Sequence, residues 1–93
     1  MAHLKQKGGY LDVAPELVVE IMSPSDRGSD VKQKLREYFS IGVRLVWVAD
    51  PTDRTVEAYR SLTDLREFKE AENLTGDEVL PGFSVSVASL FEE

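Results

Sequence analysis

The 93-residue sequence has no cysteine, a single histidine (His3) and no apolar run long enough to cross a bilayer. The lack of cysteine excludes disulfides and thiolate metal sites. A membrane-spanning helix needs about 20 consecutive apolar residues, and no signal-peptide core is present. We therefore expect no membrane partner and a cytoplasmic location. His3 lies in a polar segment, where a solvated side chain explains it better than a metal ligand.

Basic residues are also few, because 11 lysines and arginines stand against 17 aspartates and glutamates, for a net charge of −6. This charge argues against a protein that coats nucleic acid without specificity. It is compatible with a nucleic-acid enzyme whose carboxylates are offset by bound cations. The length predicts one domain or a piece of one. We expect a flexible N-terminal arm over residues 1–9 and a single domain over residues 10–93.

Residues 17–22 read LVVEIM, an apolar run interrupted only by Glu20. Such a run is typical of a buried strand. Alternate strand residues share a face, so Glu20 lies on the face of Val18 and Met22. Burying an isolated charge is costly. Glu20 is therefore paired, protonated, metal-bound or exposed at a sheet edge, where charges are common, and the pattern leaves these interpretations open.

A helix is predicted over about residues 30–41, because apolar side chains recur there at helical spacing: Val31, Leu35, Tyr38 and Phe39. The apolar residues 43–49, around Trp47, predict a second strand. Strand, helix and strand in close succession form a βαβ unit with parallel strands. Trp47 lies in a strand that we expect to be central, so its side chain should be buried.

The remaining sequence predicts short antiparallel elements. We expect a strand over residues 55–60 that pairs with the preceding one, and a charged edge strand over residues 65–70. Residues 72–78 look like an acidic loop, residues 80–82 a turn, and residues 83–87 a final strand before one helical turn over residues 88–91. The fold class is therefore α/β (α+β), a mixed sheet with a βαβ unit followed by antiparallel strands.

One helix covers only one face of such a sheet. The other face would carry apolar side chains that nothing in the chain buries, in a domain that is already small. The sequence therefore predicts association through that face, as a homodimer with a two-fold axis or as part of a larger fold.

Several separate segments of the sequence occur in the same order as in the Uma family of restriction endonucleases and resemble it. This family belongs to the PD-(D/E)XK nuclease-like superfamily. The segments are PELVVEI at residues 15–21, SPSD at 23–26, Lys34 with Tyr38 four residues on, GVRLVWVADP at 42–51 and LPGF at 80–83. The resemblance covers nearly all of the chain from Gly9 onward. It implies a restriction-endonuclease-like core, of which this chain matches the C-terminal half.

The resemblance implies metal-dependent cleavage of DNA. In the superfamily, acidic residues and a lysine surround one or two divalent cations that activate water and neutralise charge on the phosphate. Glu20 matches the second acid, and the carbonyl of Ile21 would be a further oxygen ligand. Hard oxygen ligands favour magnesium or manganese. The superfamily lysine would stand at Met22, and Lys34 matches the helical position that the Uma family uses instead. From the residues alone, a solvated lysine that flanks the apolar stripe is the better interpretation of Lys34.

The strand that supplies the first acid in the superfamily would lie upstream of Gly8, and the sequence has no counterpart there. Glu16 lies on the same strand as Glu20, about 13 Å away at ~3.3 Å per residue, which is too far for one shared cation. We therefore expect a metal-dependent DNA endonuclease fold that is inactive as this chain unless another chain supplies the ligand. The alternative is a non-catalytic oligomerisation or interaction module.

Overall fold

The computed structural model describes residues 15–92. The predicted arm over residues 1–9, with His3, lies outside the described residues. The elements follow one another as β1 (Leu17–Ile21), α1 (Gly28–Ser40), β2 (Leu45–Asp50), β3 (Thr55–Tyr59), β4 (Leu65–Phe68), β5 (Asn73–Gly76), β6 (Leu80–Ser86) and α2 (Val87–Leu90).

The central sheet has four strands in the order β1-β2-β3-β4. Strands β1 and β2 are parallel, with Glu20 beside Val48, and the pairs β2–β3 and β3–β4 are antiparallel. This confirms the predicted mixed sheet, with a βαβ unit followed by antiparallel strands. It also places β1 and β4 at the two edges, so the strand that carries Glu20 is an edge strand.

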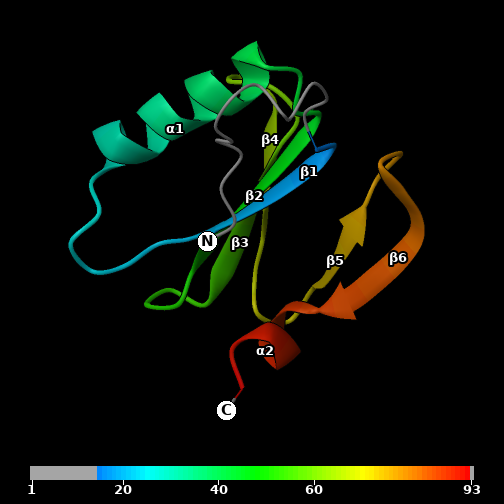
Figure 1. The fold of residues 1–93 in the computed structure, drawn as a ribbon. Helices are drawn as coiled ribbons and strands as arrows, with labels where there is room; N and C mark the ends of the chain where they lie inside the picture. Colours follow the sequence, from blue (N-terminus) through cyan, green and yellow to red (C-terminus); the bar gives the residue numbers. More distant parts are fainter. Residues whose placement is uncertain (1–14, 93) are drawn as a thin grey trace.

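Helix α1 covers one face of this sheet (Figure 1). Its predicted apolar stripe is confirmed, because Leu35 and Tyr38 are buried against the sheet. The cluster between helix and sheet consists of Val18, Leu35, Tyr38, Val43, Val46 and Val48. Gly42 ends the helix with φ of +101°, a left-handed conformation that glycine adopts without steric cost. This turn directs the chain from α1 straight into β2.

The second face of the sheet is covered by β5, β6 and α2, which lie opposite α1 in Figure 1. Leu74 of β5 and Val87 of α2 are buried there against Trp47 and its neighbours. The full cluster is Leu45, Trp47, Val56, Ala58, Phe68, Leu74 and Val87. The prediction that nothing in the chain buries this face was therefore wrong, because the chain itself covers the surface through which a homodimer was expected. The predicted burial of Trp47 is confirmed, with 8% of the residue exposed.

The covering hairpin was missed because its sequence resembles loop and turn. Residues 72–78 are not a loop, since Asn73–Gly76 pair antiparallel with β6. Residues 80–82 are not the turn, since Pro81 and Gly82 lie inside β6. The register of the hairpin shifts between Thr75 and Gly76, so Pro81, Gly82 and Phe83 have no paired residue in β5, and Gly82 has φ of +80°. Such an irregularity is a place where a strand accepts proline. The chain turns instead just after Gly76, where Asp77 has φ of +53°.

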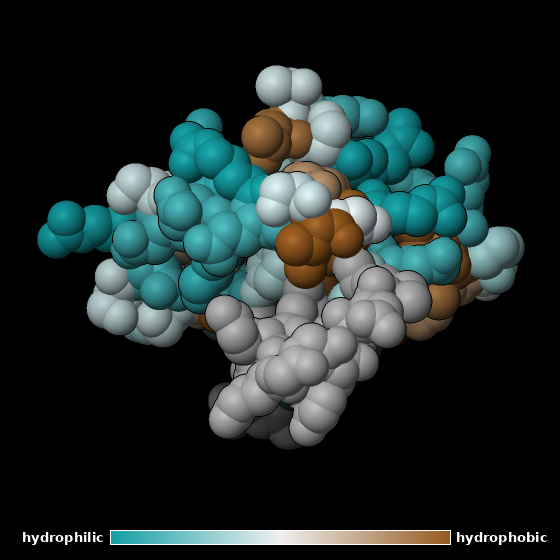
Figure 2. Space-filling view, turned by 45° about the horizontal axis from the view of Figure 1, so that its top comes forward, coloured by the Kyte–Doolittle hydropathy of each residue, from teal (hydrophilic) through white to brown (hydrophobic). Residues whose placement is uncertain are grey.

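The surface in Figure 2 is largely hydrophilic, with small separate hydrophobic areas, as expected for the outer side of a folded domain. Across residues 15–92, no helix is long and apolar enough to cross a membrane.

Candidate functional site

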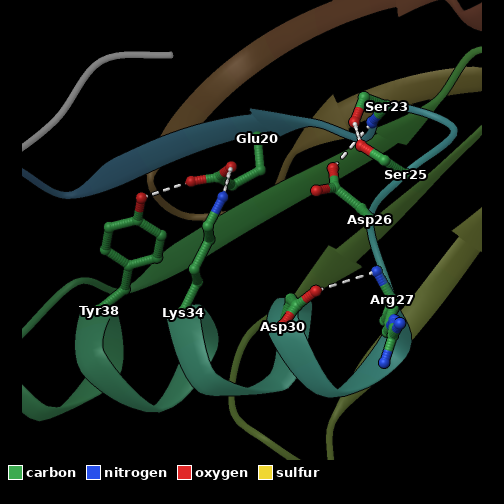
Figure 3. Close-up of polar contacts among 8 residues, drawn as sticks. All are labelled: Glu20, Ser23, Ser25, Asp26, Arg27, Asp30, Lys34 and Tyr38. Atoms are coloured by element: carbon green, nitrogen blue, oxygen red, sulfur yellow. Dashed lines mark hydrogen bonds and ion pairs between the residues drawn. The ribbon is translucent and has the colours of Figure 1, made fainter.

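A buried carboxylate lies between β1 and α1. Glu20 is only 7% exposed, and its side chain points from the strand toward the helix (Figure 3). Its Oε1 accepts a hydrogen bond from Lys34 Nζ at 3.4 Å. Its Oε2 accepts a hydrogen bond from the hydroxyl of Tyr38. Both carboxylate oxygens are therefore engaged by side chains of α1.

The sequence of α1 places these two partners together. Lys34 and Tyr38 are four residues apart, so they lie on one face of the helix. Helical side chains lean toward the N-terminus of their helix, which directs both toward the strand that precedes α1. Burial of Leu35 beside them fixes this face against the sheet. The helix face that packs on the sheet therefore also places Lys34 and Tyr38 beside Glu20.

Side chains within the loop from β1 to α1 form hydrogen bonds that hold its conformation. The backbone N–H of Ser23 donates to Oδ2 of Asp26 at 2.8 Å, and the hydroxyls of Ser23 and Ser25 are 3.1 Å apart. At the start of α1, the backbone N–H of Arg27 donates to Oδ2 of Asp30 at 3.2 Å. These bonds fix the helix start relative to the end of β1 (Figure 3), and so the position of Lys34 relative to Glu20.

The two partners of Glu20 differ in exposure and charge. The side chain of Lys34 is 47% exposed, so its ammonium is solvated while it offsets the buried negative charge. Burial, and then the hydrogen bond to Glu20, raise the pKa of the Tyr38 hydroxyl well above its usual range. Tyr38 is therefore a hydrogen-bond donor at any physiological pH.

The structure brings the two predicted catalytic residues, Glu20 and Lys34, together. Among the interpretations that the sequence left open for Glu20, the structure favours the paired one. The strand is at a sheet edge, but the side chain lies under α1 and away from water. The role of Tyr38 was not foreseen, although its spacing of four from Lys34 was the available signal. The catalytic role of Glu20 and Lys34 stays a prediction.

Glu16 does not take part in this cluster. Its side chain is 63% exposed and lies 3.7 Å from Arg44, at the other end of β1. The prediction that Glu16 and Glu20 could not share one cation is consistent with this separation.

The predicted metal ligands can be tested against the donors that are present. Within residues 15–92, no three acidic or histidine side chains come together as a metal site. Glu20 supplies one carboxylate. Met22 N–H donates to the Ala49 carbonyl, and alternate residues of a parallel strand bond to the same neighbour, so the Ile21 carbonyl is not used by β2. One carboxylate with water and substrate phosphate is a mode that magnesium accepts. These donors therefore fit a weakly held, mostly hydrated cation.

Both the sequence and the fold are similar to those of known proteins. A model of the Uma2 family, described as "Putative restriction endonuclease", matches residues 3–88. No curated protein matched. Among solved structures, the fold is similar to a "putative nuclease belonging to DUF820" from Anabaena variabilis, with a TM-score of 0.72 and 24% identity. The match covers 85% of this chain and 45% of that one, so the chain spans about half the length of that nuclease. The fold is thus the expected nuclease-like one, and the chain belongs to the Uma2 family.

Proposed function

We propose that the β1–α1 cluster is the metal-binding and phosphate-binding part of a DNA endonuclease. The observation that supports this most directly is the buried carboxylate of Glu20, which is held on both oxygens by Lys34 and Tyr38. A carboxylate fixed in this way is pre-oriented for a ligand. Membership of the Uma2 family adds the reaction class, hydrolysis of a DNA phosphodiester.

Each residue has a role in this proposal. Glu20, with the carbonyl of Ile21, would hold magnesium or manganese, which when bound supplies an activated water and neutralises charge on the phosphate. Lys34 is half exposed, so its ammonium can turn from Glu20 to a phosphate oxygen or to the attacking water. Tyr38 keeps the second oxygen of Glu20 in place during this exchange.

The distribution of charge along the chain is uneven. Residues 15–43, which form β1 and α1, contain five acidic and four basic residues. Residues 44–92 contain ten acidic and five basic residues. A polyanion is repelled by the second part and nearly unaffected by the first. The candidate site therefore lies in the part of the described chain that opposes DNA least. A DNA endonuclease acts in the compartment that holds its DNA. We expect that compartment to be the cytoplasm.

Catalysis needs more than the described residues supply. Glu20 supplies one buried carboxylate, and Asp26 and Asp30 line the same pocket, but no three acidic or histidine side chains of residues 15–92 come together as a metal site. We therefore propose that the chain binds a divalent cation weakly and cleaves DNA only when another acidic residue reaches Glu20. The alternative, a non-catalytic interaction module, is favoured by one observation, since Lys34 and Tyr38 already satisfy Glu20 without a cation.

Calorimetric titration with manganese tests the proposal. We expect weak binding to the wild-type chain, with loss of the heat in Glu20→Gln. Glu16→Gln is the matched control, because it removes an exposed acid four residues earlier and should leave the binding unchanged. Incubation with supercoiled plasmid and manganese then reports cleavage. No heat in the wild-type chain and no cleavage that depends on Glu20 would overturn the proposal in favour of the interaction module.

A further inference from the structure

Four charged side chains line one cavity between the end of β1 and the start of α1: Glu20, Asp26, Asp30 and Lys34. Three carboxylates and one ammonium leave this cavity with a formal charge of −2, which one divalent cation would balance. Glu20 is buried, whereas Asp26 is half-buried in the loop and Asp30 is exposed in the first turn of α1. The cavity thus contains two acids, Asp26 and Asp30, to which the proposed function gives no role.

Each of these two acids has one carboxylate oxygen fixed by a backbone N–H. Oδ2 of Asp26 accepts a hydrogen bond from Ser23 at 2.8 Å, and Oδ2 of Asp30 accepts one from Arg27 at 3.2 Å. Within the described residues, Oδ1 of each acid has no hydrogen-bond partner. Each acid therefore keeps one oxygen that a second partner can use.

Lys34 follows Asp30 by one helical turn (Figure 3). Residues four apart are neighbours on a helix surface, and an acid that precedes a lysine by four positions is the favourable order for an ion pair. Asp26 lies in the loop before α1, so it has no such spacing from Lys34 within the helix. Of the two acids, Asp30 is therefore the one that α1 itself places beside the lysine side chain.

The contact of Lys34 with Glu20 can be exchanged. Lys34 Nζ lies 3.4 Å from Oε1 of Glu20, which is longer than a typical hydrogen bond, and the lysine side chain is 47% exposed. A divalent cation on Glu20 would repel the ammonium, because two positive charges this close oppose each other strongly in a partly buried site. Binding of a cation to Glu20 therefore requires that Lys34 leave Oε1.

We infer that Asp30 is a positioning residue, which takes over the ammonium of Lys34 when a cation binds to Glu20. The inference rests on the proposed function of Glu20. Asp30 lowers the free-energy cost of moving Lys34 away from Glu20, and it keeps the ammonium at the cavity, where the proposed function needs it for the phosphate. The hydrogen bond from Arg27 N–H holds the carboxylate of Asp30 in place for this exchange.

A thermodynamic cycle in manganese affinity, measured by calorimetry, tests this role. Asp30→Asn removes the charge but keeps an oxygen for Arg27 N–H, and Asp30→Glu keeps the charge. We expect Asp30→Asn to weaken manganese binding by about two-fold, the size of an ion pair between residues four apart, and Asp30→Glu to restore it. In a Lys34→Gln background, Asp30→Asn should have no effect, because the acid acts only through the ammonium.

Asp26→Asn is the matched control, since Asp26 lines the same cavity, and any effect of it should be equal with and without Lys34. Thermal melting monitored by circular dichroism checks that every variant folds. An equal loss from Asp30→Asn in both backgrounds would show that Asp30 acts on the cation directly. No loss in either background would reduce Asp30 to a helix cap, and both outcomes would overturn the inference.

The position of Lys34 can also be followed without a cation. Glu20→Gln removes the charge that holds the ammonium, so we expect Lys34 to pair with Asp30 in that variant. The NMR signal of the Lys34 Cε carbon should then shift when Asp30→Asn is added to Glu20→Gln, and it should not shift when Asp26→Asn is added instead. A signal that does not respond to Asp30→Asn would overturn the inference.

The two readouts together separate the two proposals. A Lys34 signal that responds to Asp30, with no Glu20-dependent heat from manganese, supports Asp30 as the second partner of Lys34 and overturns the proposed function. Glu20-dependent heat that Asp30→Asn leaves unchanged overturns the role of Asp30 and leaves the proposed function standing.

Discussion

The hydroxyl of Tyr38, on helix α1, donates a hydrogen bond to Oε2 of Glu20, on strand β1, across 18 positions of sequence. Together with the contact of Lys34 with Oε1, this bond joins helix α1 to the edge strand β1 through a single carboxylate. The first three predictions concern this cluster.

Removal of the Tyr38 hydroxyl should destabilise the fold. Tyr38→Phe leaves one oxygen of a buried carboxylate without its donor, and hydrogen bonds to charged groups contribute about 1.5–3 kcal/mol. Urea denaturation measures the loss. Tyr59→Phe is the control, because its hydroxyl bonds to Glu57 at 3.3 Å in a partly exposed site and should matter less. Equal effects of the two substitutions would contradict the role given to Tyr38.

Stability should fall at alkaline pH through Tyr38. Burial, and then Glu20, raise the pKa of this phenol above its ordinary 10.0. The unfolded chain releases the proton near pH 10, whereas the folded chain keeps it. The contribution is therefore complete below about pH 10 and is lost as pH rises toward the folded pKa. Glu20→Gln should lower the pKa of Tyr38, as seen in the ultraviolet absorbance of phenolate after subtraction of Tyr38→Phe. An unchanged titration would contradict the coupling.

Loss of the two charged partners should have unequal effects. Glu20→Gln keeps the shape and removes a buried charge, and Lys34 can turn to water, so we expect a change in stability within about 1 kcal/mol. Lys34→Met leaves the buried carboxylate with Tyr38 alone, so it should cost more, by about 1–2 kcal/mol. The double variant should recover part of that cost. A larger loss in Glu20→Gln than in Lys34→Met would contradict this account.

Trp47 should be a main source of stability under the hairpin. It is buried, and the centroid of its ring lies 5.6 Å from the centroid of the Phe83 ring. Trp47→Ala should cost roughly 3–5 kcal/mol, measured by thermal or urea unfolding. Its Nε1 is buried with no hydrogen-bond partner among the described residues, so Trp47→Phe should cost clearly less than Trp47→Ala. An unchanged melting temperature in Trp47→Ala would contradict its place in the core.

The β5–β6 hairpin should tolerate no side chain at Gly76. A Cβ there would meet Leu80 Cβ at 2.4 Å and its carbonyl oxygen at 2.9 Å. Gly76→Ala should therefore destabilise by about 1–3 kcal/mol, as overpacking does. Gly28→Ala is the control, because nothing lies within 4 Å of its Cβ position and alanine favours the helix. A stable Gly76→Ala variant would mean that the hairpin adapts without cost.

The sequence predicted the elements that carry strong periodicity. The apolar run around Glu20, the stripe of α1 and the strand around Trp47 each have a clear pattern, and their parallel order follows from chain connectivity. The prediction failed at β5, where Leu74 is the one apolar residue among polar and acidic neighbours. It failed again at β6, where Pro81 and Gly82 are turn residues by local preference. The pairing of β5 with β6 depends on burial of Leu74 and Val85 against the sheet, which a local pattern does not contain.

The candidate site was also predictable only in part. The closeness of Lys34 to Glu20 was predictable from the lean of helical side chains and from the family resemblance. The role of Tyr38 was not, because its spacing of four from Lys34 places it on the same helix face but does not separate hydrogen bonding from packing. Only the position of its hydroxyl relative to a buried carboxylate separates the two roles.

The hairpin of β5 and β6 forms a sheet of its own, so side chains rather than a shared backbone ladder join it to the rest. Such a unit can open without disturbing the βαβ core, and segments of this kind often exchange their amides as one cooperative group. Native-state hydrogen exchange should therefore show two levels of protection, with the hairpin and α2 opening together below the free energy of global unfolding. Each opening would expose Trp47 briefly, so the chain's resistance to proteolysis would be governed by the hairpin and not by the strand that carries Glu20.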